Sequence, residues 1–294
     1  MADKKKTTLK DVARQAGVSV ATVSYILNNR TDQKISEATR KKVLQIANLL
    51  DYTPNFAAKS LATGRSNIIG VSYHLNENTP SRNLEITGFV NLLIERLNRL
   101  KYDVLFMPLR ASEDNISPNR NIDGIITIDL SHRDFIELAD NYYVPIINVD
   151  MLVNDLLFYQ IYSDIPSLIN EAQKYVGDDF YLLLDGYANE NYLEFVTGNV
   201  AKDRVLIFPE CSSGILDSLH DKKAVVIGSY LALIARAYLK DSNMAVISSN
   251  ETSHILPESV HVIRNDYSKK ANLVISIMMN ALDKKFDVTH DHKV

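Results

Sequence analysis

A run of small and hydrogen-bonding side chains between positions 19 and 28 has the chemistry needed to read the edges of DNA bases. Val20 and Ala21 are small and apolar, so they can contact the methyl group of thymine at close range. Tyr25 and Asn28 carry groups that can hydrogen-bond to a base edge. Such contacts need a rigid element that fits the major groove, so the secondary structure of this segment decides whether the chemistry is available.

Two short helices joined by a glycine turn are predicted around this run. Apolar residues recur at helical spacing from Leu9 to Ala16, and Thr8 precedes them as the start of a capping box. Gly17 tolerates the positive φ of a sharp turn, and Ser19 can cap a second helix from Val20 to Asn28. The arrangement is typical of a helix-turn-helix, whose second helix enters the major groove. The alternative is a helical hairpin buried in a larger core.

A third helix is predicted from Glu37 to Asp51, with Ser36 as its cap. Its apolar face would complete a small three-helix core. Its basic residues Arg40, Lys41 and Lys42 are either an ordinary solvated surface or phosphate contacts. Only Ser36, Thr39 and Arg40 lie close enough to the turn for contact to be favoured.

Charge is distributed unevenly along the chain. The 294 residues have a net charge of −4, yet residues 1–66 carry 12 Lys and Arg against 5 Asp and Glu, and the remainder carries 20 against 31. The first segment therefore has the positive charge that phosphate neutralisation requires, whereas the acidic remainder resists wrapping DNA.

Four stretches share one pattern over residues 8–71: Leu9–Ser19, Ala21–Asn28, Tyr52–Ser66 and Ile68–Val71. Together they resemble the LacI/GalR family of bacterial repressors. The resemblance implies a helix-turn-helix DNA-binding domain over residues 1–53 and a hinge helix with its linker over residues 54–66. It also implies a set of DNA-contacting residues, with Ser19 to Asn28 in the major groove: Thr8, Ser19, Val20, Ala21, Thr22, Ser24, Tyr25, Asn28, Ser36, Thr39, Tyr52, Asn55, Lys59, Leu61 and Ala62. Tyr25 and Lys59 stand where arginine is common in the family, so the preferred operator sequence cannot be carried over.

The segment from Asn55 to Ala62 is too short to be a stable helix by itself. It has eight residues and follows Pro54, whereas an isolated helix becomes marginal in water below about 12 residues. We expect it to fold only on DNA, where Leu61 would insert between base steps of the minor groove as a wedge. The alternative for Leu61 is packing against its own domain.

From Asn67 onward, apolar runs alternate with amphipathic segments, which predicts a doubly wound α/β architecture. There are enough units for two lobes, and the break is expected between Asp150 and Tyr162. The predicted strands are Ile68–Tyr73, Asp103–Met107, Gly124–Ile128, Pro145–Val149, Phe180–Leu184, Ala224–Ile227 and Met244–Ser248. The predicted helices are Glu85–Leu100, Ser131–Asn141, Ile165–Val176, Tyr230–Leu239 and Ser268–Lys285.

The part of the chain from Asn67 onward, here called the body, resembles the periplasmic-binding-protein-like effector domain of the same family. Four segments carry the resemblance: Tyr102–Leu105, Ile122–Ile126, Val144–Asp150 and Ala232–Ala237. The resemblance implies one effector-binding and dimerisation domain of two lobes over residues 67–294. Between positions 107 and 121 a short polar stretch stands where the family has a helix, so we expect this domain to be somewhat truncated.

The cleft between the lobes, at the carboxyl ends of the strands, is the default place for a ligand. The residues expected to line it are Tyr73, His74, Asn76, Asp150, Asp185, Tyr187, Ser229, Tyr230 and Asn250, each of which could equally be an ordinary loop or strand-end residue. Sugar-binding members have an arginine near positions 191–195, an Asn-Asp or similar pair at Gly228-Ser229 and an aspartate at Asn250. This chain lacks all three, which argues against a carbohydrate held by charged groups.

Other classes of protein have little support. The single Cys211 excludes an intramolecular disulfide, and the chain has no Walker A, HExxH or Gly-x-Ser-x-Gly pattern. His290-Asp291-His292 at the chain end is interpreted as a solvated tail rather than a metal site. No apolar run approaches the roughly 18 residues of a membrane span, and Met1 to Lys6 lack the apolar stretch of a secretion signal. We therefore expect a cytoplasmic protein that is not an enzyme and has no cofactor.

The sequence thus predicts a homodimeric transcription regulator, a repressor by resemblance, that binds double-stranded operator DNA. A ligand in the cleft, a carbohydrate or related metabolite, would modulate operator affinity. One alternative is a regulator whose C-terminal domain has lost small-molecule sensing and acts as a dimerisation or protein-docking module. Another is a sugar-binding or sugar-processing protein with an accessory head.

Overall fold

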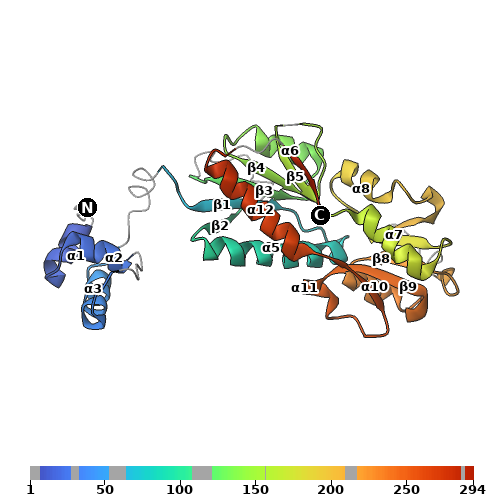
Figure 1. The fold of residues 1–294 in the computed structure, drawn as a ribbon, viewed down its shortest axis with the longest axis horizontal. Coiled ribbons are helices and arrows are strands. Elements are labelled where there is room, and N and C mark those ends of the chain that lie inside the picture. Colours follow the sequence, from blue (N-terminus) through green and yellow to red (C-terminus); the bar gives the residue numbers. More distant parts are fainter. Residues whose placement is uncertain are drawn as a thin grey trace. The chain divides into compact units, whose positions relative to one another are not determined.

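The computed structural model describes residues 7–27, 33–52, 64–107, 121–155, 157–208, 217–285 and 289–294. It divides into two compact units, Met1–Ser66 and Asn67–Val294, each with its own elements (Figure 1). Within these described ranges, none of the helices has the length and apolar character needed to cross a membrane.

Three helices around one core form the first unit: α1 (Leu9–Ala16), α2 (Val20–Leu27) and α3 (Glu37–Leu49). The capping box at Thr8 is present, and Gly17 ends α1 with a φ of 68°. The buried core consists of Val12, Ala13, Ala16, Val23, Ile26, Val43 and Ala47. The expected helix-turn-helix and its third helix are therefore confirmed.

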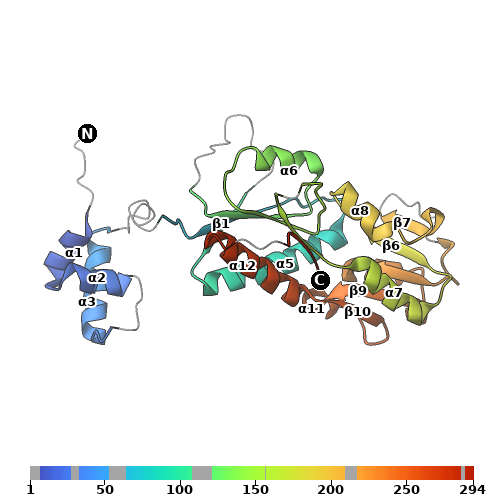
Figure 2. The same cartoon turned by 45° about the horizontal axis from the view of Figure 1, so that its top comes forward.

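The second unit begins with a six-stranded parallel sheet in the order β11-β5-β4-β3-β1-β2. Its strands are β1 (Ile68–Tyr73), β2 (Asp103–Phe106), β3 (Gly124–Ile128), β4 (Ile146–Val149), β5 (Tyr159–Tyr162) and β11 (Asp291–Lys293). The long helices α5 (Pro80–Arg99) and α12 (Tyr267–Leu282) run side by side over one face, and α6 (His132–Ala139) covers the other (Figure 2). Helices on both faces of a parallel sheet confirm the doubly wound architecture.

A second parallel sheet has five strands in the order β10-β9-β8-β6-β7. These are β6 (Tyr181–Asp185), β7 (Val205–Phe208), β8 (Ala224–Ile227), β9 (Met244–Ser249) and β10 (His261–Asn265). The helices α7 (Ile165–Val176) and α8 (Glu190–Thr197) pack on one face, while α10 (Ser229–Ala235) packs on the other. The single-turn α11 (Asn250–Ser253) follows β9. Two lobes, each with its own sheet, are therefore present.

The chain passes between the lobes twice, which the sequence reading did not anticipate. It leaves the first sheet after Tyr162, at the end of the expected interval, and enters α7 of the second lobe at Ile165. It returns after Asn265, so α12 and β11 complete the first lobe. One lobe is thus assembled from two separate stretches of sequence.

Four strands, β5, β7, β10 and β11, were not predicted, and three of them lie at sheet edges. An edge strand is covered on fewer sides, so it needs no continuous apolar run; β10 reads HVIRN and β11 reads DHK. The interpretation of His290–His292 as a solvated tail is therefore wrong, because Asp291–Lys293 pairs in register with β5. Helix α5 also begins at Pro80 rather than at Glu85.

Gly228, between β8 and α10, lies where the backbone of the second lobe comes very close to the first lobe. Its φ is 100°, and a Cβ built there would lie 2.1 Å from Oγ of Ser81, a residue of α5 in the other lobe. We expect Gly228→Ala to lower the free energy of unfolding by about 2 kcal/mol or more, because both backbone strain and overlap oppose it. Denaturant unfolding measures the change.

Gly186→Ala is the matched control for this substitution. Gly186 has no positive φ, and its added Cβ would meet Ile207 at an ordinary 3.6 Å. Equal losses in the two variants would contradict a specific close approach at Gly228.

Candidate functional site

The exposed face of α2 is the first candidate site. Val20 is 41% exposed and Ala21 is also exposed, whereas Val23 and Ile26 are buried in the three-helix core. Oγ of Ser19 accepts a hydrogen bond from the backbone amide of Thr22 at 3.0 Å, which fixes the start of the helix. The core thus holds α2 so that its small residues face outward, as groove entry requires.

The other described residues of the predicted DNA-contacting set are caps or partly buried side chains. Thr8 caps α1, and Ser36 caps α3 by accepting from the amide of Thr39 at 3.2 Å. Helix N-termini present amide groups that attract phosphate, so such caps suit contact with a DNA backbone. Tyr52 packs against the core, and burial raises the pKa of its hydroxyl. Ser24 and Tyr25 are half-buried on α2.

Five residues of that set, Asn28, Asn55, Lys59, Leu61 and Ala62, lie outside the described residues. The polar stretch between positions 108 and 120, read as a trimmed helix, lies outside them too.

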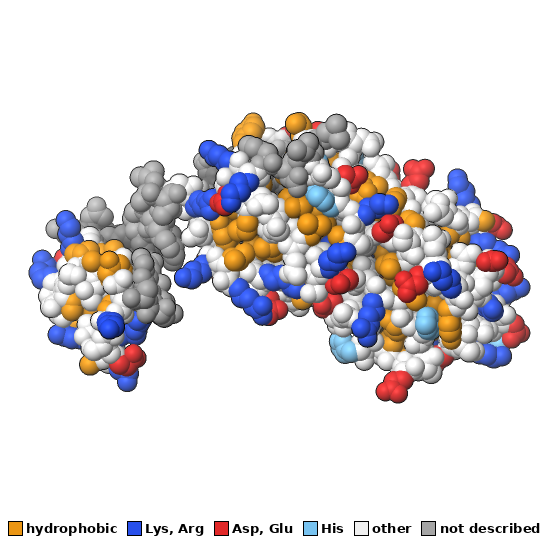
Figure 3. Space-filling model, viewed as in Figure 1, with side chains coloured by type: hydrophobic (Ala, Val, Ile, Leu, Met, Phe, Trp, Pro, Cys, Tyr) orange, Lys and Arg blue, Asp and Glu red, His pale blue; other side chains and the backbone are white. Residues whose placement is uncertain are grey.

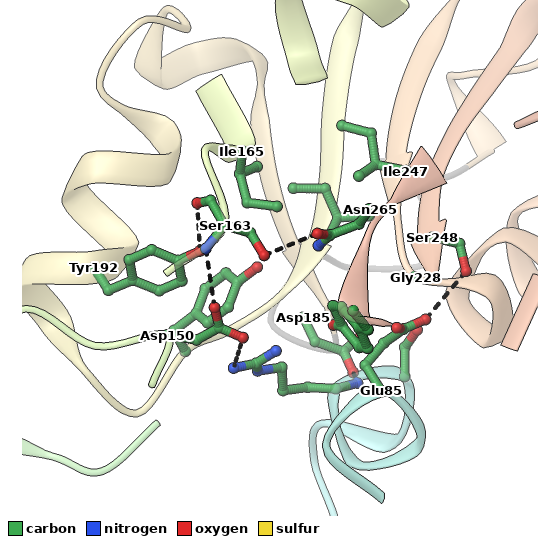
Figure 4. A pocket seen from close by; sticks show the side chains of 15 residues that line it. Glu85, Asp150, Ser163, Ile165, Asp185, Tyr192, Gly228, Ile247, Ser248 and Asn265 are labelled. Carbon is green, nitrogen blue, oxygen red and sulfur yellow. Dashed lines mark hydrogen bonds and ion pairs between the residues drawn. The ribbon is translucent and has the colours of Figure 1, made fainter. Parts of the chain in front are cut away.

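The cleft between the lobes is the second candidate site, and buried ion pairs occupy its centre. Figure 4 shows the carboxylate of Asp150 in one of these pairs. Arg82, in the first turn of α5, donates from Nε to Asp129 at 2.9 Å and from Nη2 to Asp150 at 3.4 Å. Lys270, in the first turn of α12, donates from Nζ to both carboxylate oxygens of Asp150, at 2.9 and 2.8 Å. Four separate segments of the chain therefore meet at two carboxylates.

Backbone geometry aims these two carboxylates into the cleft. Asp129 follows β3 with a φ of 50°, and Asp150 follows β4 with a φ of 47°. A left-handed conformation costs a non-glycine residue roughly 1–2 kcal/mol, and it persists only where the surroundings stabilise it. Here the ion pairs with Arg82 and Lys270 provide that stabilisation.

Burial and the neighbouring charges act on the pKa of each of these groups in opposite directions. Burial would raise the pKa of Asp150, but Lys270 and Arg82 outweigh it and the pKa is lowered. Burial lowers the pKa of Lys270, although Asp150 opposes that shift. The pKa of Asp129 is raised by burial despite its bond to Arg82. Asp150 is therefore the carboxylate that the two cations hold most firmly in its ionised form.

Hydrogen bonds that carboxylates accept also connect the two lobes. Asp129 accepts from the backbone amides of Ala188 and Asn189 at 3.0 and 3.2 Å. Asp185, at the end of β6, accepts from the amide of Arg82 at 2.9 Å. Glu85 of α5 accepts from the hydroxyl groups of Ser248 and Thr252 in the second lobe. Each of the three acidic groups thus has a partner across the cleft.

Two cavities adjoin this network. A small one of about 20 Å³ is lined by residues that include Asp150, Asp185 and Tyr187. A larger one of about 430 Å³ is lined by residues that include His74, Asn76 and Tyr187. Arg82 and Tyr187 line both, so the cavities are neighbours. Five of the nine residues expected at the cleft therefore lie at one cavity or the other.

The other four lie elsewhere. Tyr73 lines a groove between β1, β2 and α5. Ser229 is fully buried and bonded to Ser248 and Thr252, Tyr230 is 42% exposed, and Asn250 is exposed at the start of α11.

Sequence reasoning missed Arg82, Glu85, Asp129 and Lys270. Asp129 directly follows a buried strand, and a search for polar residues at the carboxyl ends of strands would have found it. Pro80 marks a helix start that would have placed Arg82 in the first turn of α5. Nothing local distinguishes Lys270, which has an exposed lysine at position 269 beside it.

Comparison with known proteins gave consistent matches. Residues 8–55 match the family model described as bacterial regulatory proteins, lacI family. A probable HTH-type transcriptional repressor of Bacillus subtilis, ExuR, is 33% identical over 287 residues, which cover 83% of this chain and 81% of the relative. The regulator GalS of Salmonella typhimurium is 56% identical over 64 residues, 22% of this chain and 18% of its own length.

Solved structures match the fold of the whole chain. A lac repressor dimer bound to operator and the anti-inducer ONPF has a TM-score of 0.65 at 18% identity, covering 99% of this chain and 96% of that one. A complex of the transcriptional regulator CelR with cellobiose has a TM-score of 0.59 at 14% identity, covering 98% and 97%.

Lys270→Met tests the importance of the buried ion pairs. Removing one partner leaves Asp150 buried with less compensation, so we expect the free energy of unfolding to fall by about 3–5 kcal/mol. The neighbouring Lys269→Met should change it by no more than about 0.5 kcal/mol, because Lys269 is exposed. Denaturant unfolding of both variants gives the comparison, and a loss at position 270 no larger than at 269 would contradict the role given to the ion pair.

Proposed function

This chain belongs to the LacI family of bacterial regulatory proteins, and we propose that it represses transcription by binding an operator as a homodimer. The exposed small-residue face of α2 is the observation that carries the proposal. Two helix-turn-helix heads in a two-fold dimer read two half-sites, so the operator is expected to be pseudo-palindromic. No catalytic step is assigned to the chain.

The charge difference between the two units supports DNA binding by the first unit rather than by the second. Residues 1–66 have an excess of Lys and Arg, and the rest of the chain has an excess of Asp and Glu. Figure 3 shows Lys and Arg side chains around the small unit, whereas on the larger unit they are interspersed with Asp and Glu. The head therefore attracts the phosphate backbone, and the body adds no comparable attraction.

We assign residues 1–53 to the DNA-binding head, residues 54–66 to a hinge helix with its linker, and residues 67–294 to the effector-binding and dimerisation domain. In this assignment the predicted residues of α2 read base edges, the caps Thr8 and Ser36 contact phosphates together with Thr39 in the first turn of α3, and Leu61 inserts into the minor groove.

A ligand in the cleft between the lobes modulates operator affinity in our proposal. The larger cavity, about 430 Å³, falls within the usual size of small-molecule sites. The solved relatives include CelR with cellobiose and a LacI-type regulator with D-xylulofuranose, so a carbohydrate or related metabolite is the class we propose. The ligand would act by binding more tightly to one arrangement of the lobes than to the other.

A second candidate function is favoured by the packed centre of the cleft. Arg82 and Lys270 fill it with ion pairs to the chain's own carboxylates. In this second candidate function, residues 67–294 bind no small molecule and act as a dimerisation or protein-docking module. Saturable thermal stabilisation by any metabolite would reject this candidate.

Salt dependence tests the proposed DNA binding. The logarithm of the binding constant for fragments selected from genomic DNA should fall linearly with the logarithm of salt concentration, by about 0.9 for each neutralised phosphate. Fluorescence anisotropy at several salt concentrations measures the slope. An affinity that ignores salt, or that survives deletion of residues 1–62, would remove the proposal.

Ala21→Asp tests the face of α2. A carboxylate there would approach the acceptor-rich DNA, so specific binding should weaken at least tenfold while the folded head keeps its stability, because position 21 is exposed. Gln45→Asp, which adds the same charge at an exposed position of α3, should weaken binding much less. Equal effects of the two substitutions would mean that α2 has no special part in binding.

A further inference from the structure

Two carboxylate oxygens in the cleft have no hydrogen-bond partner among the described residues: Oε2 of Glu85 and Oδ1 of Asp185. Both side chains are more than nine-tenths buried, with residue exposures of 5% and 4%. Both line the small cavity, whose volume is about 20 Å³. Figure 4 shows the two side chains among the residues that line it. That volume holds one group the size of a water molecule.

The buried charges around this cavity do not balance. Glu85, Asp129, Asp150 and Asp185 are four buried acidic residues, whereas Arg82 and Lys270 are two buried cations. The cluster is therefore deficient in positive charge when all four carboxyl groups are ionised.

The side chains of Lys270 and Arg82 bond to Asp129 and Asp150, and not to Glu85 or Asp185. Lys270 uses its three N–H donors on the two oxygens of Asp150 and on Oγ of Ser163 at 2.9 Å. Arg82 pairs through its side chain with Asp129 and Asp150, and the ring of Tyr187 covers its guanidinium at 4.7 Å. Lys270 thus has no N–H donor left for a further group, whereas a cation entering the cleft finds two incompletely bonded carboxylates.

A buried acceptor without a partner is costly, and a donor that carries positive charge compensates it best. Burial raises the pKa of Asp185, and its amide hydrogen bonds and Arg82 only partly oppose that shift. A water molecule could supply a hydrogen bond but not the missing charge. An ammonium group supplies both, and it is close to water in size.

The larger neighbouring cavity has room for the rest of such a molecule. It measures about 430 Å³, shares Arg82 and Tyr187 with the small one, and adds the polar side chains of His74 and Asn76. Ile207 and Phe208 give it an apolar wall. A ring that carries hydroxyl groups suits this mixture of polar and apolar surface.

We propose that the ligand of this cleft is an amine-bearing molecule of monosaccharide size, such as an amino sugar. Its ammonium group binds between Glu85 and Asp185, and its hydroxyl-bearing ring lies in the larger cavity. This inference rests on the proposed sensing of a carbohydrate-like metabolite and adds the charge that the metabolite must carry.

Three probes that differ mainly in charge test the inference: glucosamine, glucose and glucuronate. The thermal midpoint of the full chain is measured with each, at equal ionic strength and at a pH where the amine is protonated. Glucosamine should raise the midpoint saturably by a few degrees, glucose should bind at least tenfold more weakly, and glucuronate should have no effect. Stabilisation by glucuronate equal to that by glucosamine, or none by glucosamine at millimolar concentration, would overturn it.

Isosteric variants locate the ammonium group. Glu85→Gln and Asp185→Asn keep the side-chain shape but remove the charge and add an N–H₂ donor, so each should lose the preference for glucosamine over glucose. Glu190→Gln, at an exposed position of α8, removes the same charge elsewhere in the second lobe and should retain the preference. A preference that survives both cleft substitutions would contradict the site. If neither cleft variant folds, the probe series on the unaltered chain still decides.

Operator binding measured on the same preparation separates the two proposals. A chain that binds DNA with the expected salt slope but does not prefer the amine refutes only the ligand assignment. A chain that ignores every duplex refutes the regulatory function, whatever the probes show.

Discussion

The carboxylate of Asp150 is the group on which the arrangement of the body depends. It accepts from Lys270 with both oxygens and from Arg82 with one, and its Oδ1 also accepts from the amide of Ser163, where the chain passes into the second lobe. A charge buried this deeply is stable only with partners in good geometry. The same carboxylate therefore ties α5, α12 and the crossing between the lobes to the end of β4.

This constraint explains why the cleft can act as a switch. Its centre is polar, and Glu85, Asp129 and Asp185 each bond across the gap, so a small relative movement of the lobes changes several charged hydrogen bonds together. Apolar surfaces tolerate sliding because their attraction has no direction, whereas buried charges do not. A ligand that completes the bonding of one arrangement would shift the balance between arrangements by its difference in affinity.

The head is built on the opposite principle. Its core is small and apolar, its polar groups are used at helix ends, and its positive charge is spread over solvated side chains. Such a surface attracts phosphate at long range, and in the proposed function it leaves selection among base sequences to a few short side chains on α2. Charge in the head thus favours attraction to phosphate, whereas buried charge in the body determines which side chains pair in the cleft.

The sequence by itself determined the elements whose cause is local. The capping residues Thr8, Ser19 and Ser36, the turn at Gly17 and the spacing of apolar residues are sufficient to define the head, because helix start, turn and buried face each depend on a few neighbouring positions. Most interior strands were equally legible, since a strand covered on both faces is a continuous apolar run.

Only the tertiary structure decided what fills the cleft. Lys270 meets Asp150 across 120 positions of sequence, and Glu85 meets Thr252 across 167. No local pattern encodes such pairs, because they follow from the order of strands in two sheets and from the return of the chain to the first lobe. The edge strands β10 and β11 were missed for a related reason: their neighbours on the sheet, rather than their own composition, make them strands.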